Sequence, residues 1–264
     1  MIKLVVTDVD GTLLDDNKNL SPDFWDTIAA LTRKNIIFSV ASGRQYYTLA
    51  RQFARIAAGT LFLAENGTYV SYKNRELFTN ALDLAAARNF IKIGRTITGA
   101  YPILCGKNSA YVENDNEQFI LESSRFYEKY QRVNDLTKVE DTILKVTLFD
   151  FHDAEKHAYL RFKQYEHQYK IAPAGKRWVD ITAPTASKGS ALRRVQGLLG
   201  ISPDETLVFG DYLNDLEMMR EAKYSHAMKN AHPEIIKAAN YITEHDNNHH
   251  GVTRTIRKLC LGHD

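Results

Sequence analysis

The sequence predicts an α/β fold: a parallel sheet with helices on both sides, interrupted by an inserted α+β segment. Strand-like and helix-like patterns alternate in the first 80 residues and again in the last 80 of the 264. Between them the pattern changes and includes hairpin-like alternation. We therefore predict three divisions: residues 1–80 as the first part of a core domain, 81–183 as an inserted domain, and 184–264 as the second part of the core.

In the first part, residues 2–6 form a short run that is apolar except for Lys3, as expected for a strand buried on both faces. Ser21 and Pro22 predict the start of a helix, with serine at the N-cap and proline at the first helical position. Two further buried strands are predicted at residues 36–40 and 61–64. A helix that runs past residue 50 separates them.

The last part repeats this alternation. Residues 188–199 carry apolar side chains at helical spacing, and Ser187 is the expected N-cap. Residues 206–209 predict a buried strand, and 214–221 the helix after it. Two short strand regions follow, at residues 222–228 and 239–243.

The inserted segment differs in pattern and in its lack of carboxylate clusters at strand ends. Residues 103–112 alternate in the manner of a hairpin. The simplest organisation is one α/β core, split in sequence, that carries this α+β insertion.

Composition and charge limit the classes of partner. The net charge is +2, from 34 basic and 32 acidic residues, without a block of like charge, so we expect no nucleic-acid or membrane partner. No apolar stretch is long enough to span a membrane, and no cleavage site follows the short N-terminal apolar run. Two cysteines far apart suit a reducing compartment. We expect a cytoplasmic protein, and nothing implies a protein partner.

Chemically active residues gather where the predicted strands end, and in an open parallel sheet ligands bind beyond these carboxyl ends. The residues follow three predicted strands and open one predicted helix: Asp8 and Asp10, Ser42 and Gly43, Asp211 and Asp215, and Lys188. Carboxylates, a lysine and backbone amides at one edge suit a hard divalent cation together with a phosphate.

Each segment also has a simpler interpretation. Residues 8–12 could be a solvated turn, and Lys188 a solvated lysine at a helix start. A calcium loop of the EF-hand type is excluded, because glycine falls at the fourth position of the segment and Asn19 at the twelfth. The joint order of the segments argues against these alternatives.

In their order, these segments resemble the four motifs of the haloacid dehalogenase-like hydrolase superfamily. The motifs are DVDGTLL at residues 8–14, SGR at 42–44, Lys188, and GDYLND at 210–215. The sequence ENG at 65–67 and the position of the insertion resemble the Cof-type (subfamily IIB) branch. This resemblance implies a Rossmann-like core with an inserted cap domain. Lys229 departs from the branch, which usually carries glycine at that position.

The resemblance also implies a role for each motif residue. Asp8 would be the nucleophile that accepts the phosphoryl group and also contacts Mg²⁺, and Asp10 the acid and base. The remaining residues divide into three groups: Val9, Ser42, Gly43, Lys188 and Asn214 for phosphate; Asp211, with the backbone of Asp10, for the metal; Thr12 and Asp215 in support.

The implied function is magnesium-dependent hydrolysis of a small phosphorylated metabolite, such as a sugar phosphate, through an aspartyl phosphate. A phosphomutase of the same superfamily shares all four motifs and stays open as an alternative. A non-catalytic sensor of phosphorylated ligands is a second alternative, although it has no need of both Asp8 and Asp10. A dehalogenase of the same superfamily lacks the second acid, so the presence of Asp10 argues against that activity.

Overall fold

The computed structural model describes residues 1–262, which form two compact units. The first unit contains residues 1–43, 53–77 and those from 187 onward, and the second contains 44–52 and 78–186. Residues 44–52, predicted with the core, group with the inserted segment because the Gln45 side chain binds the backbone of Lys129. The amide of Gln45 donates to the Lys129 carbonyl at 3.0 Å and accepts from the Lys129 N–H at 2.9 Å.

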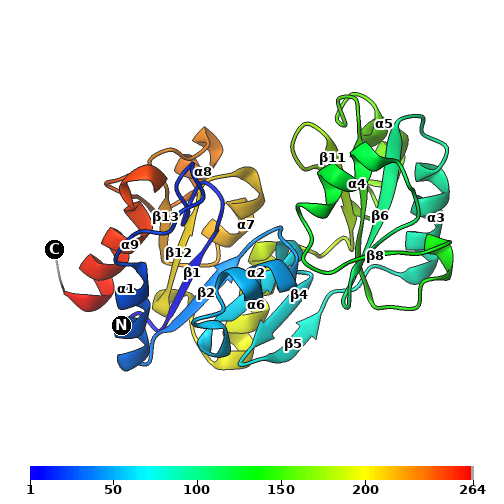
Figure 1. Ribbon diagram of the computed structural model, residues 1–264. Helices are drawn as coiled ribbons and strands as arrows, with labels where there is room; N and C mark the ends of the chain where they lie inside the picture. The colour runs from blue at the N-terminus through cyan, green and yellow to red at the C-terminus, as the bar shows by residue number, and fades with distance from the viewer. Residues whose placement is uncertain (263–264) are drawn as a thin grey trace. The chain divides into compact units, whose positions relative to one another are not determined.

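The first unit is built on a sheet of strand order β14-β13-β12-β1-β2-β3-β4-β5 (Figure 1). Its strands are β1 (Leu4–Thr7), β2 (Ile37–Ala41), β3 (Leu61–Ala64), β4 (Tyr69–Tyr72), β5 (Arg75–Thr79), β12 (Thr206–Gly210), β13 (Tyr224–Ala227) and β14 (Tyr241–Ile242). The α-helices of this unit are α1 (Phe24–Arg33), α6 (Lys188–Leu199), α7 (Leu216–Met219), α8 (Pro233–Ala238) and α9 (Gly251–Ile256). The predicted α/β fold with a parallel-sheet core is confirmed.

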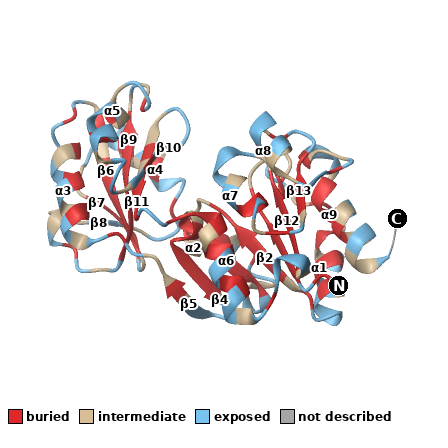
Figure 2. Cartoon of the chain, turned by 180° about the vertical axis from the view of Figure 1, so that it is seen from behind, coloured by how far each residue is buried: buried red, intermediate tan, exposed pale blue. Residues whose placement is uncertain are grey.

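The parallel register brings the predicted site segments to one edge of this sheet. Strand β1 pairs in parallel with β2 and β12, and Thr7 lies opposite Val40 on one side and Phe209 on the other. All residues of β1 and β12 are buried, as their continuous apolar runs predict (Figure 2). The next residues along the three strands therefore emerge side by side.

Two local predictions differ from the structure. Helix α1 begins at Phe24 rather than at Pro22, because the Phe24 N–H bonds back to the Ser21 carbonyl in a turn. The antiparallel strand β4 and the edge strand β5 were not predicted. The turn between them is Lys73-Asn74, and both residues have positive φ angles, 52° and 58°.

The second unit has a mostly antiparallel sheet of order β10-β11-β9-β6-β7-β8. Its strands are β6 (Ala100–Gly106), β7 (Ala110–Val112), β8 (Tyr130–Arg132), β9 (Ile143–Asp150), β10 (Lys170–Pro173) and β11 (Trp178–Thr182). Its α-helices are α2 (Tyr46–Gln52), α3 (Leu84–Gly94), α4 (Glu117–Ser124) and α5 (Ala158–Phe162). The predicted hairpin in residues 103–112 is β6–β7, in which Leu104 pairs with Tyr111.

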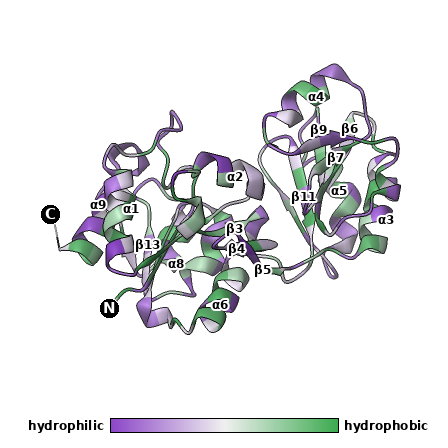
Figure 3. Cartoon of the chain, turned by 60° about the horizontal axis from the view of Figure 1, so that its bottom comes forward, coloured by the Kyte–Doolittle hydropathy of each residue, from purple (hydrophilic) through white to green (hydrophobic). Residues whose placement is uncertain are grey.

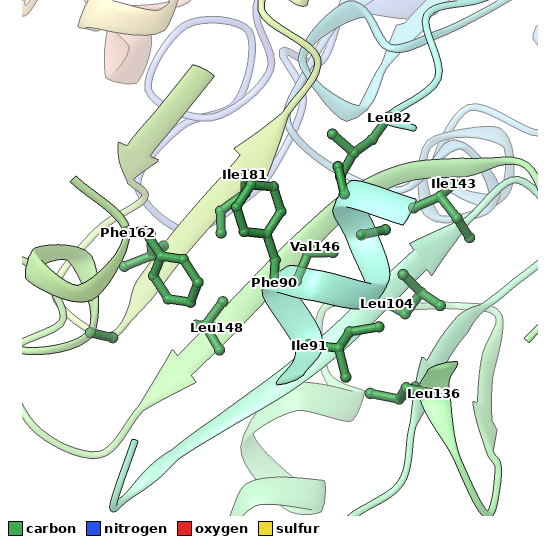
Figure 4. Close-up of a cluster of buried hydrophobic side chains, with 14 of the residues drawn as sticks. Leu82, Phe90, Ile91, Leu104, Leu136, Ile143, Val146, Leu148, Phe162 and Ile181 are labelled. Carbon is green, nitrogen blue, oxygen red and sulfur yellow. The ribbon is translucent and has the colours of Figure 1, made fainter. Parts of the chain in front are cut away.

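Hydrophobic clusters lie on both faces of this second sheet. Along β6, Leu104 packs in the cluster that includes Phe90 of α3, whereas Ile103 and Cys105 pack in the cluster that includes Phe119 of α4. Figure 4 shows Phe90 and Ile91 pointing from α3 into the first cluster. The strands are largely hydrophobic, while α3 mixes hydrophobic and hydrophilic residues (Figure 3). The inserted segment thus has a core of its own.

No helix in residues 1–262 has the length and the apolar character needed to cross a membrane.

Candidate active site

Asp8 lies immediately beyond β1 and is 6% exposed. Its backbone N–H donates to the Phe209 carbonyl at 3.0 Å, which continues the pairing of β1 with β12 by one residue. The position of this carboxylate is therefore fixed by the sheet itself rather than by a mobile loop.

Lys188 reaches Asp8 from the first position of α6. The cap of this helix is reciprocal: the Ser187 hydroxyl accepts from the Ser190 N–H at 3.0 Å, and the Ser190 hydroxyl accepts from the Ser187 N–H at 3.2 Å. The next residue, Gly189, allows close approach of α7, because a Cβ atom there would lie 2.5 Å from that of Glu217. The helix start is thus held firmly, and Lys188 is fully buried.

The Lys188 ammonium group donates to two carboxylates. It contacts Asp8 Oδ1 and lies 2.7 Å from Asp215 Oδ1. Asp215 is also fully buried, and its Oδ2 accepts from the N–H groups of Asp211 and Tyr212 at 3.0 and 3.3 Å. Because both oxygens of Asp215 are occupied in this way, it orients Lys188 and closes the loop after β12.

Asp211 is held by the first motif. The Thr12 hydroxyl donates to Asp211 Oδ1 at 2.6 Å. Gly11, with φ +76°, makes room for this carboxylate, since a Cβ atom at Gly11 would lie 2.5 Å from Asp211 Oδ2. Residues 8–12 and the loop after β12 therefore fit each other only with glycine at this position.

The carboxylates of Asp8, Asp211 and Asp215 lie close together, and the Lys188 ammonium group contacts two of them. Burial raises the pKa of Asp8 well above its usual range, which Lys188 opposes and the Asp215 and Asp211 carboxylates reinforce. Burial also raises the pKa of Asp211, to about 6, against the hydrogen bond from Thr12. For Lys188, burial lowers the pKa, but Asp215 and Asp8 raise it further, so the lysine stays protonated.

These residues fit a divalent cation. One ligand atom from each of Asp8, Asp211 and Asp215 lies within 4.8 Å of the others. Of these carboxylates, Asp8 and Asp211 each have an oxygen, Oδ2, that accepts no hydrogen bond from residues 1–262. Two carboxylate oxygens in a negatively charged, buried setting are the donor set that Mg²⁺ prefers. Asp8 and Asp211 would hold the ion, and Asp215 would not.

The second motif is linked to the fourth through Asn66, which the sequence analysis did not assign to the site. Ser42 is buried at the end of β2, and its carbonyl accepts from the Asn66 N–H at 2.8 Å. A Cβ atom at Gly43 would lie 3.1 Å from the Asn66 side-chain nitrogen, and Asn66 Oδ1 accepts from the Asn214 amide at 3.2 Å. The ENG sequence at 65–67 could have pointed to this turn, because asparagine tolerates the left-handed backbone conformation that Asn66 adopts, with φ 55°.

Asp10 and Val9, the other predicted residues of the first motif, follow Asp8 in the sequence. Asp10 is partly exposed, and its Oδ1 accepts from Lys18 at 2.9 Å, a contact that was not predicted. Val9 is buried, and its carbonyl accepts from the Leu14 N–H at 2.9 Å, which closes the motif into a compact turn.

The segment around Lys229 keeps its shape without glycine. Lys229 is exposed and is not among the described residues with positive φ, so a side chain is tolerated there. The next residue, Asn230, donates to the Gly11 carbonyl at 2.8 Å and thereby braces the first motif. This contact is a further one that the sequence analysis missed.

Comparison with known proteins places these features in a family. The chain matches the haloacid dehalogenase-like hydrolase family over residues 5–256. It is 32% identical over 261 residues to the 5-amino-6-(5-phospho-D-ribitylamino)uracil phosphatase YbjI of Escherichia coli (strain K12), covering 98% of this chain and 96% of that relative. It is 23% identical over 285 residues to the phosphatase YwpJ of Bacillus subtilis (strain 168), covering 98% and 100%.

Solved structures share the whole fold. A crystal structure from Eubacterium rectale has a TM-score of 0.89 at 30% identity and covers 97% of this chain and 98% of its own. The subclass IIB sugar phosphatase BT4131 has a TM-score of 0.80 at 20% identity, with the same coverage, and so shows the likeness of fold alone.

Proposed function

This chain belongs to the haloacid dehalogenase-like hydrolase family and is a phosphatase; from that premise we propose that it hydrolyses small phosphate monoesters with Mg²⁺, through a phospho-aspartate on Asp8. The observation that carries the proposal is the contact between the buried Asp8 carboxylate and Lys188, with Asp211 close enough to share a cation. A nucleophilic carboxylate must be ionised. Lys188 favours the ionised form of Asp8 against the effect of burial, and a bound Mg²⁺ would favour it further.

In the first step, the Asp8 carboxylate attacks phosphorus, and the bond from phosphorus to the ester oxygen breaks. Asp10, which is partly exposed, gives its proton to the departing alkoxide. In the second step, Asp10 takes a proton from water, whose oxygen attacks phosphorus, and the bond to Asp8 breaks. Inorganic phosphate leaves, and both carboxyl groups return to their starting states.

The other residues bind phosphate oxygens and hold the acceptor. Lys188, Ser42, the N–H of Gly43 and the backbone of Val9 would bind the phosphoryl oxygens, together with Asn214. When bound by Asp8, Asp211 and the backbone of Asp10, Mg²⁺ would supply positive charge that neutralises the phosphoryl oxygens. Thr12 and Asp215 keep Asp211 and Lys188 in place.

For the substrate, we propose a phosphorylated polyol or sugar. The support is the name of the Escherichia coli relative, a phosphatase of a phosphoribitylamino-uracil that is 32% identical to this chain. We also propose that residues 81–183, which contain none of the motif residues, form a cap domain that selects among such esters.

The test is a panel of phosphate esters that includes the phosphoribitylamino-uracil, several sugar phosphates and an aryl phosphate. We expect release of inorganic phosphate that requires Mg²⁺ and stops when a chelator is added. Release without a bisphosphate activator would separate the phosphatase from a mutase. If no ester released phosphate, the proposal would be wrong.

Replacing Asp8 by asparagine tests the covalent step. We expect Asp8→Asn to abolish turnover and to leave the fold intact, because the amide is isosteric but cannot form the phospho-aspartate. Phosphate release and circular dichroism measure the two effects. Asp26→Asn, which changes an exposed acid on α1, is the matched control and should keep full activity. Turnover of Asp8→Asn within about tenfold of the wild type would refute the assignment.

A further inference from the structure

A second group of metal-binding side chains lies in the other unit, around the end of β9. Asp150 is the last residue of that strand and is fully buried. Its Oδ1 accepts from the His152 N–H at 2.9 Å, and its Oδ2 accepts from the Ala158 N–H at 3.1 Å. The carboxylate therefore ties the loop of residues 151–157 to the start of α5.

Two imidazoles lie next to this carboxylate. The Nδ1 atom of His157 is 2.8 Å from Asp150 Oδ2. The rings of His152 and His157 meet edge to face, with centroids 4.9 Å apart. His152 rests over the backbone of Gly99, where a Cβ atom would lie 3.0 Å from its Nε2 atom.

Besides this geometry, the Asp150 carboxylate lacks a lysine or arginine partner among the described residues. Within residues 1–262, no lysine or arginine forms an ion pair with this fully buried carboxylate, and His157 is the group with which it can share a charge. Buried carboxylates are normally paired with a cation or bound to a metal. The histidines are accessible to an incoming ion, since the His157 side chain is 39% exposed and His152 is exposed.

We propose that Asp150, His152 and His157 form a zinc site that is separate from the magnesium site of the phosphatase. One ligand atom from each of the three lies within 4.8 Å of the others, and a bound ion would replace the hydrogen bond between His157 Nδ1 and Asp150 Oδ2. Asp215 differs from Asp150 in that its Oδ1 is held by the charged Lys188 ammonium group. Around a tetrahedral zinc ion, ligand atoms are roughly 3.3 Å apart, so a small movement of exposed imidazoles closes the site. Water completes the coordination.

The ligand types select the metal. Imidazole together with one carboxylate suits zinc and other late first-row ions, whereas Mg²⁺ prefers oxygen ligands alone. Asp150 is also anchored by two backbone N–H groups, and such anchoring of a ligand strengthens metal sites. A bound ion would connect β9, the loop and α5, and thereby stabilise the second unit.

The experiment is zinc binding by the full chain, without a polyhistidine tag, after treatment with a chelator. Excess Mg²⁺ is present to occupy Asp8 and Asp211. We expect equilibrium dialysis to find a stoichiometric zinc ion in the wild type, and zinc to raise the midpoint of thermal unfolding. In His152→Ala and His157→Ala, we expect the zinc dissociation constant to rise at least about tenfold and the midpoint shift to disappear.

His249→Ala is the matched control. The Nδ1 atom of His249 lies 2.7 Å from Asp246, so it has a carboxylate partner but belongs to no metal-ligand cluster found in residues 1–262. This variant should bind zinc as the wild type does. If His152→Ala and the wild type bound zinc equally, or if neither bound it, the cluster would serve only to cap α5 and the proposal would be overturned.

Discussion

Lys188 has no exposed surface, and its ammonium group contacts the carboxylates of Asp8 and Asp215. Removing one member of a buried ion pair leaves an uncompensated charge, which costs about 3–5 kcal/mol. In the proposed mechanism the lysine therefore has two separable roles, one in the stability of the folded state and one in binding the phosphoryl group.

Replacing Lys188 separates these two roles. We expect Lys188→Met to lower turnover at saturating Mg²⁺ by roughly 10²-fold or more and also to destabilise the protein. The double variant Lys188→Met with Asp215→Asn removes one charge of each sign, so it should recover much of the stability but none of the turnover. Denaturant unfolding and phosphate release provide the two measurements. Recovery of activity in the double variant would contradict the role of Lys188 as a phosphate ligand.

Asp211 allows the magnesium requirement to be tested with little structural change. Asp211→Asn keeps an oxygen that can accept from Thr12 but loses the charge. We expect the Mg²⁺ concentration for half-maximal activity to rise roughly tenfold or more, because one of the two proposed carboxylate ligands has become neutral. Thr12→Val removes the hydrogen bond that holds Asp211 in place, so it should also raise the Mg²⁺ concentration for half-maximal activity. An unchanged magnesium requirement in Asp211→Asn would remove this residue from the metal site.

Sequence patterns point to the charged residues of the candidate site more directly than to the residues that hold them in place. Asp8, Lys188 and Asp211 occupy strand ends and a helix start, and those positions are visible as local patterns. The ENG sequence marks the position of Asn66, but nothing in the neighbourhood of Asn66 or of Asn230 indicates which distant groups their side chains contact. Their partners, Asn214 and Gly11, become neighbours only when the sheet has formed.

At the scale of the elements, buried strands are predicted well and exposed ones poorly. Strand β1 contains the apolar run of residues 4–6, whereas β5 begins with two exposed charged residues, Arg75 and Glu76. The turn Lys73-Asn74 lacks the glycine that usually signals a tight hairpin. The predicted start of α1 was wrong because Ser21 and Pro22 form a turn before the helix. Local signals thus fail where tertiary contacts decide the outcome.

The β13 strand carries a buried histidine that should make stability depend on pH. His226 lies between Phe209 of β12, at a ring distance of 5.5 Å, and Tyr241 of β14, which it stacks on at 4.9 Å. Burial lowers the pKa of His226 below its ordinary value of 6.5. The folded state therefore favours the neutral ring, while the unfolded chain takes up a proton near pH 6.5.

The sign of the effect follows from this difference. The contribution of His226 to stability is present above pH 6.5 and is lost as the pH falls toward the lower pKa of the folded state. We expect the free energy of unfolding to fall in that interval by at most about 1.4 kcal/mol per pH unit more than in His226→Phe. Urea unfolding between pH 5 and 8 measures it. A slope in His226→Phe equal to that of the wild type would contradict the prediction.

At the scale of the whole molecule, each unit has its own aromatic core. In the first unit, Phe24 is 1% exposed and meets the rings of Phe38 and Phe53 at 5.7 and 6.1 Å. In the second, Phe90 is equally buried and meets the rings of Tyr165 and Tyr169 at 5.4 and 5.0 Å. The alternating pattern placed residues 44–52 with the core, because it could not show that α2 contacts the inserted segment.

This division predicts that the two units open separately. Replacement of a buried phenylalanine by alanine costs about 3–5 kcal/mol, and in a chain of two units that loss falls on the unit that contains it. We expect Phe90→Ala to reduce hydrogen-exchange protection in residues 78–186 and to leave β1 and β12 protected. Phe24→Ala, the matched variant, should produce the opposite pattern, because its partners lie in the first unit. Exchange read out by mass spectrometry on peptides from each unit distinguishes the outcomes. Equal loss of protection in both units from either variant would mean that the chain unfolds as one cooperative domain, and the proposed core and inserted domain would have to be abandoned as separate folding units.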